Sequence, residues 1–354
     1  MKKLVLLLIM VAVVGSFSFI NKFMQDEPVP IPPSKQRTGG DPQKGYNYLV
    51  TGDYIKGGVP LNIFLLGAMG EKKHIRREGL NKNIPHGYTA VTASNGEVLV
   101  APNCLQCHAQ VFESQLIIGL GNSLVDFTKN EKINASNFDL LEKILKIKAP
   151  RQYEASAPFL TISKTIAPYL FMEVKGVNMA DRLAAVLAAH RDPVTFQWQS
   201  GKALPLPSEV IPADTPPWWL LKKKNAMFYN GFGRGDFGRF LMASNLLTVN
   251  DTAESRSVDE HMPDVLAYIY SLQAPKYPKT IDRALASQGK VIFEQSCSDC
   301  HGTYSTNATY PNLLIPASII KTDSFLYNQL HSSSACSCWR FTRDAMTILA
   351  SNSR

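Results

Sequence analysis

The pentapeptide Cys104-Leu105-Gln106-Cys107-His108 has a counterpart far along the chain, Cys297-Ser298-Asp299-Cys300-His301. Both follow the pattern C-x-x-C-H. The chain holds 6 Cys and 7 His among 354 residues, so a random sequence of this composition would contain about 0.002 copies of the pattern. Two copies by chance can therefore be dismissed, and they indicate one chemical purpose used twice.

The spacing suits covalent attachment of a c-type haem. Two thiols separated by two residues on one helical turn can reach the two vinyl groups of a single haem, and the adjoining imidazole then supplies a nitrogen ligand to the iron. The sequence thus predicts two covalently bound c-type haems. The attachment residues are Cys104, Cys107, Cys297 and Cys300, and the axial iron ligands are His108 and His301.

Two other kinds of site use similar cysteine pairs. A thioredoxin-type dithiol needs its C-x-x-C after a strand in a βαβ unit, and neither copy has that setting. A structural zinc site needs four ligands, whereas one loop offers three and two loops would have to pool six. The sequence favours haem, with zinc and a redox dithiol as the alternatives.

Composition sets the broad class. The length corresponds to about two domains, and 45% hydrophobic with 19% charged residues is too apolar for a disordered chain. No short-period repeat is present, which argues against a solenoid. The net charge of +8 suits an acidic partner or a membrane surface, and such a diffuse basic excess does not indicate a nucleic-acid partner.

The N-terminus has the layout of an export signal. Met1-Lys2-Lys3 precedes the apolar run 4–14 and then Gly15-Ser16. Counted on to residue 20, the run reaches the lower limit for a membrane span. We therefore expect residues 1–20 to be a signal peptide or a membrane anchor. The body of the protein is then either free in the periplasm or anchored at the outer face of the inner membrane. Residues 21–43 form a Pro/Gly-rich spacer.

Periodicity and turn residues predict the local structure. Asn95-Gly96 predicts a hairpin between strands at 89–94 and 97–100. Two prolines within residues 273–279 mark a domain boundary, which gives a first domain at 44–274 and a second at 280–354. Apolar spacing predicts helices at 138–147, 179–190 with Asn178 as cap, 259–272 and 282–294.

Several segments resemble a known family. Gly289-Lys290-Val291-Ile292-Phe293 looks like the first helix of a cytochrome c domain, and residues 263–272 resemble its closing helix. Residues 41–46, 101–104, 189–193 and 215–219 together resemble exported bacterial di-haem c-type cytochromes, a group related to the di-haem cytochrome c peroxidases and rubber oxygenases. The resemblance covers most of residues 41–323. It implies a mainly α fold with two cytochrome c-like domains, the first enlarged by an insert between His108 and the closing helix.

The end of the chain departs from that family. Relatives continue past the equivalent of residues 310–314 with a segment that closes the second domain and usually supplies its sixth iron ligand. After Ser324, residues 332–340 do not look like that continuation. We expect an incomplete second domain from a truncated or frameshifted reading frame. The C-x-C of Cys336 and Cys338 then lies in a tail without function, with a metal or redox site as the alternative.

The second axial position of each iron separates two functions. A Met or His there suits electron transfer, whereas an open position lets peroxide or dioxygen bind. His190, Met227 and Met242 are the candidates for the first haem, with helix capping or core packing as the other interpretation of each. His331 and Met346 are the candidates for the second haem.

Other residues admit two interpretations each. Trp218 and Trp219 form either a buried aromatic corner or, as in related di-haem enzymes, an electron relay. Arg234 or Arg239 would pair with a haem propionate. The lysines at 222–224 form a solvated surface or a docking site for an acidic redox partner.

The sequence as a whole favours an electron carrier. We expect a di-haem c-type cytochrome that passes electrons to or from a periplasmic or membrane redox partner. The alternative is a haem-dependent oxidoreductase, a di-haem peroxidase or oxygenase with an open first haem, and a non-redox haem sensor is a third. No catalytic residue can be assigned from the sequence.

Overall fold

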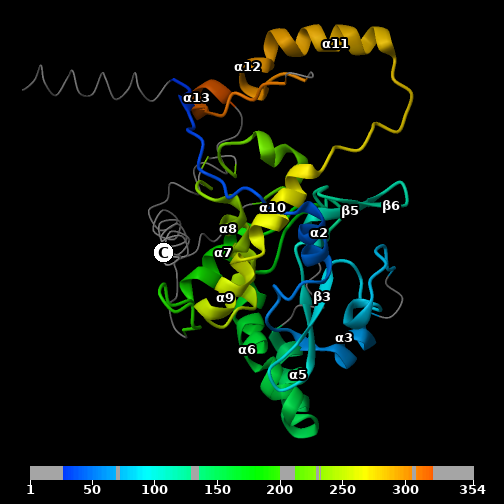
Figure 1. Ribbon diagram of the computed structural model, residues 1–354, viewed down its shortest axis with the longest axis vertical. Helices are drawn as coiled ribbons and strands as arrows, with labels where there is room; N and C mark the ends of the chain where they lie inside the picture. Colours follow the sequence, from blue (N-terminus) through cyan, green and yellow to red (C-terminus); the bar gives the residue numbers. More distant parts are fainter. Residues whose placement is uncertain are drawn as a thin grey trace, which may run out of the picture. The chain divides into compact units, whose positions relative to one another are not determined.

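A computed structural model describes residues 27–68, 72–128, 135–199, 212–228, 231, 233–304 and 308–321 (Figure 1). The chain divides into two compact units. The larger unit consists of the described residues of Lys35–Lys222 and Gly235–Lys276. The smaller unit consists of those of Met1–Ser34, Lys223–Arg234 and Tyr277–Asn328.

The larger unit is mainly α-helical, as expected. Its α-helices are α2 (Pro42–Thr51), α3 (Leu61–Gly67), α4 (Leu105–His108), α5 (Ala135–Lys148), α6 (Pro150–Ile166), α7 (Ala180–Ala189), α8 (Phe237–Leu241), α9 (Thr252–Asp259) and α10 (Met262–Ser271). Short 3₁₀-helices are η1 (Gly79–Asn81), η2 (Ala167–Tyr169), η4 (Met242–Leu247) and η3 (Trp218–Lys223), the last of which ends at the first residue of the smaller unit. The strands are β2 (Val59–Pro60), β3 (Tyr88–Thr92), β4 (Val98–Pro102), β5 (Ala109–Phe112) and β6 (Gln115–Ile118).

The predicted hairpin is confirmed. Strands β3 and β4 pair antiparallel with Tyr88 opposite Pro102 and Thr92 opposite Val98. Gly96 has φ of +85°, the left-handed conformation that a glycine adopts without strain. Strand β2 pairs with the other edge of β4, giving the order β2-β4-β3. A second hairpin, β5–β6, begins directly after His108.

Two of the predicted helices differ from the structure in an instructive way. The helix expected over residues 259–272 is two helices, because α9 ends at Asp259 and α10 begins at Met262. Pro263 lies in the first turn of α10, where its missing N–H costs nothing, and it cannot continue a preceding helix. Helix α7 begins at Ala180 with Met179 at the cap position, although the side chain of Asn178 still accepts a hydrogen bond from the Ala180 N–H at 2.8 Å.

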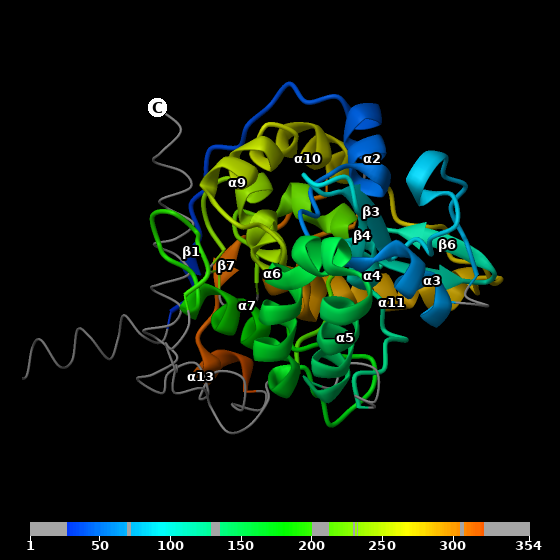
Figure 2. The ribbon, with the colours of Figure 1, turned by 90° about the horizontal axis from the view of Figure 1, so that it is seen from below.

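Helices α2 and α10 pack against each other, and Figures 1 and 2 both show them side by side. Their backbones approach so closely that a Cβ at Gly45 would lie 1.9 Å from the carbonyl oxygen of Asp264. Only glycine fits this crossing. Elsewhere α6, α7 and η4 enclose an aliphatic core of Ile162, Ile166, Val186, Leu187, Leu246 and Val249.

The smaller unit gathers three separate pieces of chain. Its elements are β1 (Val29–Pro30), α11 (Arg283–Ser296), α12 (Ser298–His301), β7 (Leu313–Leu314) and α13 (Ala317–Ile320), and β1 pairs antiparallel with β7. The Asn225 side chain donates to the Ile31 carbonyl at 2.8 Å, and Asn312 donates to the Lys223 carbonyl at 3.1 Å. These bonds explain why residues 223–234, assigned from sequence to the first domain, belong to this unit.

The expected spacer is part of both units. Val29 and Pro30 form a strand of the smaller unit. Arg37 belongs to the larger unit, where it forms ion pairs with Asp236 at 2.9 Å and Asp259 at 2.8 Å. Residues 27–37 therefore contribute to the folded body.

A buried arginine organises the chain before β3. Arg77 is buried and donates hydrogen bonds to the carbonyls of Val50 and Tyr88 through Nη1, and to those of Ile84 and Pro85 through Nη2. Burial lowers the pKa of its guanidinium. One side chain thus donates to four carbonyls, of which that of Pro85 also accepts from the Tyr88 N–H at 3.1 Å, and it ties the loop to α2 and β3.

Replacing Arg77 with Met should lower the free energy of unfolding by about 3 kcal/mol or more, because several buried carbonyls lose their donor. Arg76→Met is the matched control. Arg76 has a side chain that is 94% exposed, so its loss should change the free energy by at most about 0.5 kcal/mol. Urea denaturation of the two variants measures both effects. Equal stability of the two variants would contradict the assigned role of Arg77.

Candidate functional site

The first C-x-x-C-H motif follows the end of β4, and Asn103 positions it. The Asn103 amide donates to the His86 carbonyl at 2.9 Å and to Thr89 Oγ1 at 2.8 Å. Its Oδ1 accepts a hydrogen bond from the Leu105 N–H at 2.9 Å. Asn103 therefore anchors the start of the motif to the hairpin while it caps the helical turn that follows.

The motif itself is a single helical turn. The His108 N–H donates to the Cys104 carbonyl at 3.0 Å, and α4 ends at His108. On the far side, the Asn122 N–H donates to the Cys107 carbonyl at 2.8 Å, and the Asn122 side chain donates to Gln106 at 3.0 Å. The turn is thus held at both ends, with the two cysteines and the histidine on one piece of rigid backbone.

His108 stacks on Trp218. The ring centroids are 4.5 Å apart and the rings are 20° from parallel. One residue links the two backbones: the Gly119 N–H donates to the His108 carbonyl at 2.8 Å, and the Gly119 carbonyl accepts from the Trp218 N–H at 2.8 Å. The β5–β6 hairpin returns the chain to this point. A residue 110 positions away is thereby placed over the imidazole.

The two stacked rings carry unsatisfied nitrogens. His108 Nδ1 and Trp218 Nε1 are both buried without a hydrogen-bond partner in the described part of the chain. Burial lowers the pKa of His108 to about 4. The imidazole is therefore neutral at pH 7 and offers a lone pair, the form in which histidine binds a metal.

The thiols are protonated in this environment. Cys104 and Cys107 are partly buried and form no disulfide. Burial raises the pKa of both thiols, that of Cys107 to about 11, and hydrogen bonding from Ser244 and Tyr54 only partly offsets the effect at Cys104. A redox dithiol works with a lowered thiol pKa, so this environment does not suit thioredoxin-type chemistry.

The second motif has the same local geometry in a different setting. Asp282 caps α11, and the His301 N–H donates to the Cys297 carbonyl at 2.9 Å. Cys300 and His301 are exposed, and no residue of α11 is buried. Leu285 and Ile292 are 64% and 63% exposed. An apolar helix face therefore lies open beside the second motif, where the first motif is enclosed.

The candidates for the second axial ligand lie in several places. His190 is the C-cap residue of α7. Its Nδ1 lies 2.9 Å from the Gln199 carbonyl oxygen, and its ring stacks on Trp198. Met242 is buried at the start of η4, the element that also carries Ser244 beside Cys104. Met227 belongs to the smaller unit. His331 and Met346, like Cys336 and Cys338, lie outside the described residues.

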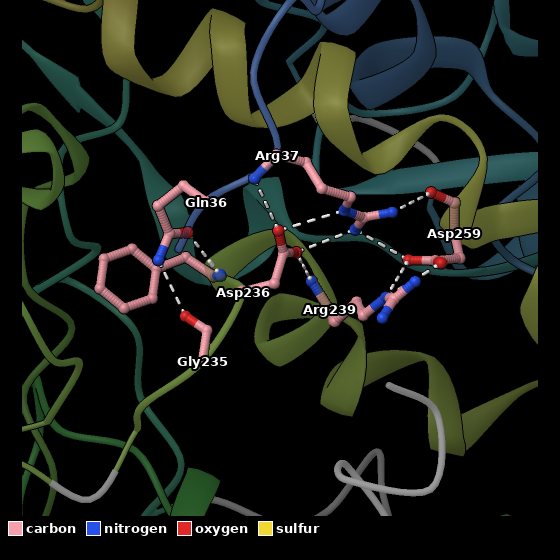
Figure 3. Close-up of polar contacts among 7 residues, drawn as sticks. Gln36, Arg37, Gly235, Asp236, Arg239 and Asp259 are labelled. Atoms are coloured by element: carbon pink, nitrogen blue, oxygen red, sulfur yellow. Dashed lines mark hydrogen bonds and ion pairs between the residues drawn. The ribbon is translucent and has the colours of Figure 1, made fainter. Parts of the chain in front are cut away.

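Arg239 and Arg234, which the sequence offered as partners of a haem propionate, form hydrogen bonds to other groups of the protein. Figure 3 shows Arg239 and Arg37 converging on Asp259. Arg239 Nε donates to Asp259 Oδ2 at 3.1 Å, and Arg239 N–H donates to Asp236 Oδ1 at 2.9 Å. Arg234 Nε donates to the Gly231 carbonyl at 2.9 Å. The charge of Arg239 is thus balanced within the protein.

The structure adds residues that the sequence did not single out. Asn103, Gly119 and Asn122 hold the first motif, and Tyr54 and Ser244 adjoin Cys104. The position of Asn103, between a strand and a helical turn, was a readable capping signal. Gly119 gave no such signal, because its role depends on a distant tryptophan.

A search of protein-family models finds no match for this chain, and a search of curated proteins finds none. Among the described residues, no helix has the length and apolar character needed to cross a membrane. In the same residues, no three His, Cys, Asp or Glu side chains gather as a metal-ion site would require. The motifs, rather than a relative, must carry any functional assignment.

Gly119→Ala tests the link between His108 and Trp218. Gly119 has φ of +89°, and an added Cβ would lie 2.7 Å from Leu272 Cδ1. Strain and overlap together should lower the free energy of unfolding by at least about 2 kcal/mol. Gly67→Ala is the control, because nothing lies within 4 Å of its added Cβ. In denaturant unfolding, Gly67→Ala should leave the free energy of unfolding unchanged or slightly raised. An unchanged free energy of unfolding in Gly119→Ala would refute the claim that only glycine fits at position 119.

Proposed function

We propose that this protein is a di-haem c-type cytochrome that carries electrons between redox partners outside the cytoplasm. One observation carries the proposal. Cys104, Cys107 and His108 lie on a single helical turn. The two thiols form no disulfide, and the imidazole is neutral. This is the donor set that covalent haem attachment requires.

The residues of the first motif would act in two ways. Each thiol of Cys104 and Cys107 would add its sulfur and its hydrogen across one vinyl double bond, which forms a thioether without net oxidation. His108 would donate its lone pair to the iron. When bound, haem supplies an iron that alternates between the ferric and ferrous states.

The surroundings of His108 would tune that iron. Trp218 is buried against the imidazole, and Leu105 is fully buried within the motif. Packing of this kind fixes the plane of an axial ligand and keeps water away from it, two of the means by which proteins adjust a haem potential. The buried, protonated thiols also weaken the redox-dithiol alternative.

The second motif also supports haem attachment, because an exposed apolar helix face lies beside it. Cys297, Cys300 and His301 repeat the turn, and the neighbouring face of α11 exposes Leu285 and Ile292. Large exposed apolar side chains grouped together usually mark a surface that another group covers. A porphyrin held by this motif would provide that cover.

The site of action follows from the N-terminus. A basic start and an apolar run support export to the periplasm, as a free protein or one anchored at the inner membrane. Net charge of +8 favours an acidic redox partner. Lys222 is partly committed to the fold, since its Nζ donates to the Tyr270 carbonyl at 3.0 Å.

Counting covalent haem per chain tests the proposal. Protein produced with a c-type haem maturation system should carry two haems, measured by intact mass and by the pyridine haemochrome spectrum. Cys104→Ala/Cys107→Ala and Cys297→Ala/Cys300→Ala should each carry one, and the fourfold variant none. Cys336→Ser/Cys338→Ser is the control and should keep two. A wild-type chain without covalent haem under these conditions would refute the function.

A further inference from the structure

Helix α5 exposes an apolar stripe to solvent. Leu140, Ile144 and Ile147 are 59%, 46% and 75% exposed. Successive residues of an α-helix are about 100° apart, so these three side chains fall within about 60° of one another. The helix lies at an extremity of the larger unit with α6 beside it (Figure 1), and it is in the foreground of Figure 2.

The opposite side of α5 is occupied by the protein. Leu145 is buried there. Glu142 pairs with Lys146 at 2.7 Å and with Lys164 of α6 at 2.5 Å, and Lys164 also pairs with Asp139 at 3.3 Å. Both acidic side chains of this helix are thereby neutralised within the α5–α6 pair, away from the apolar stripe.

Two lysines border the stripe. Lys143 and Lys148 are exposed, and neither forms an ion pair with a described residue. On the helix they lie about 40° beyond either edge of the stripe. From Leu140 to Lys148, the exposed face of α5 thus presents three aliphatic side chains between two cations, with no carboxylate among them.

We propose that this face of α5 binds the surface of a bilayer containing anionic lipids. Aliphatic side chains would enter the boundary between headgroups and acyl chains, while Lys143 and Lys148 extend along it to reach lipid phosphates. A protein partner fits this face of α5 less well, because the face lacks the aromatic and arginine side chains that dominate protein interfaces. The helix has 14 residues, so it would lie on the membrane without spanning it.

Amine footprinting of the full-length protein tests this contact directly. An acetylating reagent is applied with and without vesicles, and modification of each lysine is read by mass spectrometry. Phosphatidylglycerol-containing vesicles should protect Lys143 and Lys148 at least about threefold, and pure phosphatidylcholine vesicles should not. Lys72 and Lys73, exposed on a loop of the same unit, serve as internal controls.

Variants separate this face from other membrane-binding segments. Ile144→Ser/Ile147→Ser should abolish the protection of Lys143 and Lys148 and weaken partition into anionic vesicles about tenfold. Lys143→Gln/Lys148→Gln removes the reporting amines and should weaken the partition about tenfold, whereas Leu66→Ser/Val194→Ser should change neither protection nor partition. Unprotected lysines in the wild type would overturn the proposal, even if the chain still sediments with vesicles. Protection by polyglutamate alone, or by a concentration-dependent dimer, would also overturn it by assigning a protein partner. None of these outcomes depends on bound haem.

Discussion

The imidazole of His108 stacks on the buried Trp218, and much of the larger unit serves to keep it there. The imidazole is neutral because burial lowers its pKa to about 4, and neither its Nδ1 nor the indole nitrogen has a protein partner in the described chain. An unsatisfied buried nitrogen costs about 1–3 kcal/mol. Asn103, Asn122 and Gly119 hold the backbone around this pair. The free-energy cost of these unsatisfied nitrogens falls at a C-x-x-C-H turn. Binding of a group that uses the imidazole lone pair would explain why the fold keeps the histidine there.

The two motifs share a backbone conformation and differ in their surroundings. Around the first, β3–β4, β5–β6 and η3 enclose the turn. Around the second, α11 leaves its apolar face in solvent. If both motifs bind haem, the second haem will be the more solvated one, and solvent exposure alone separates haem potentials.

Local features of the fold could be predicted from sequence, and long-range ones could not. Asn95-Gly96 specified its hairpin, and Asp282 specified the start of α11, because both signals act within a few residues. The break between α9 and α10 was missed, although Pro263 marked it. The stacking of Trp218 on His108 could not be predicted, since it depends on Gly119 and on the return of a hairpin. The two C-x-x-C-H motifs could be found in the sequence because each is confined to five residues.

Low-temperature EPR of the ferric, haem-loaded full-length protein is the most direct test of the electron-transfer function proposed for the first motif. An electron carrier needs an iron with protein ligands on both sides, with His108 as one and His190 or Met242 as candidates for the other. The expected result is a low-spin signal that persists when Cys297 and Cys300 are replaced by Ala. A high-spin signal that persists in that variant would contradict electron transfer as the function of the first haem, and it would favour a peroxidase or an oxygenase.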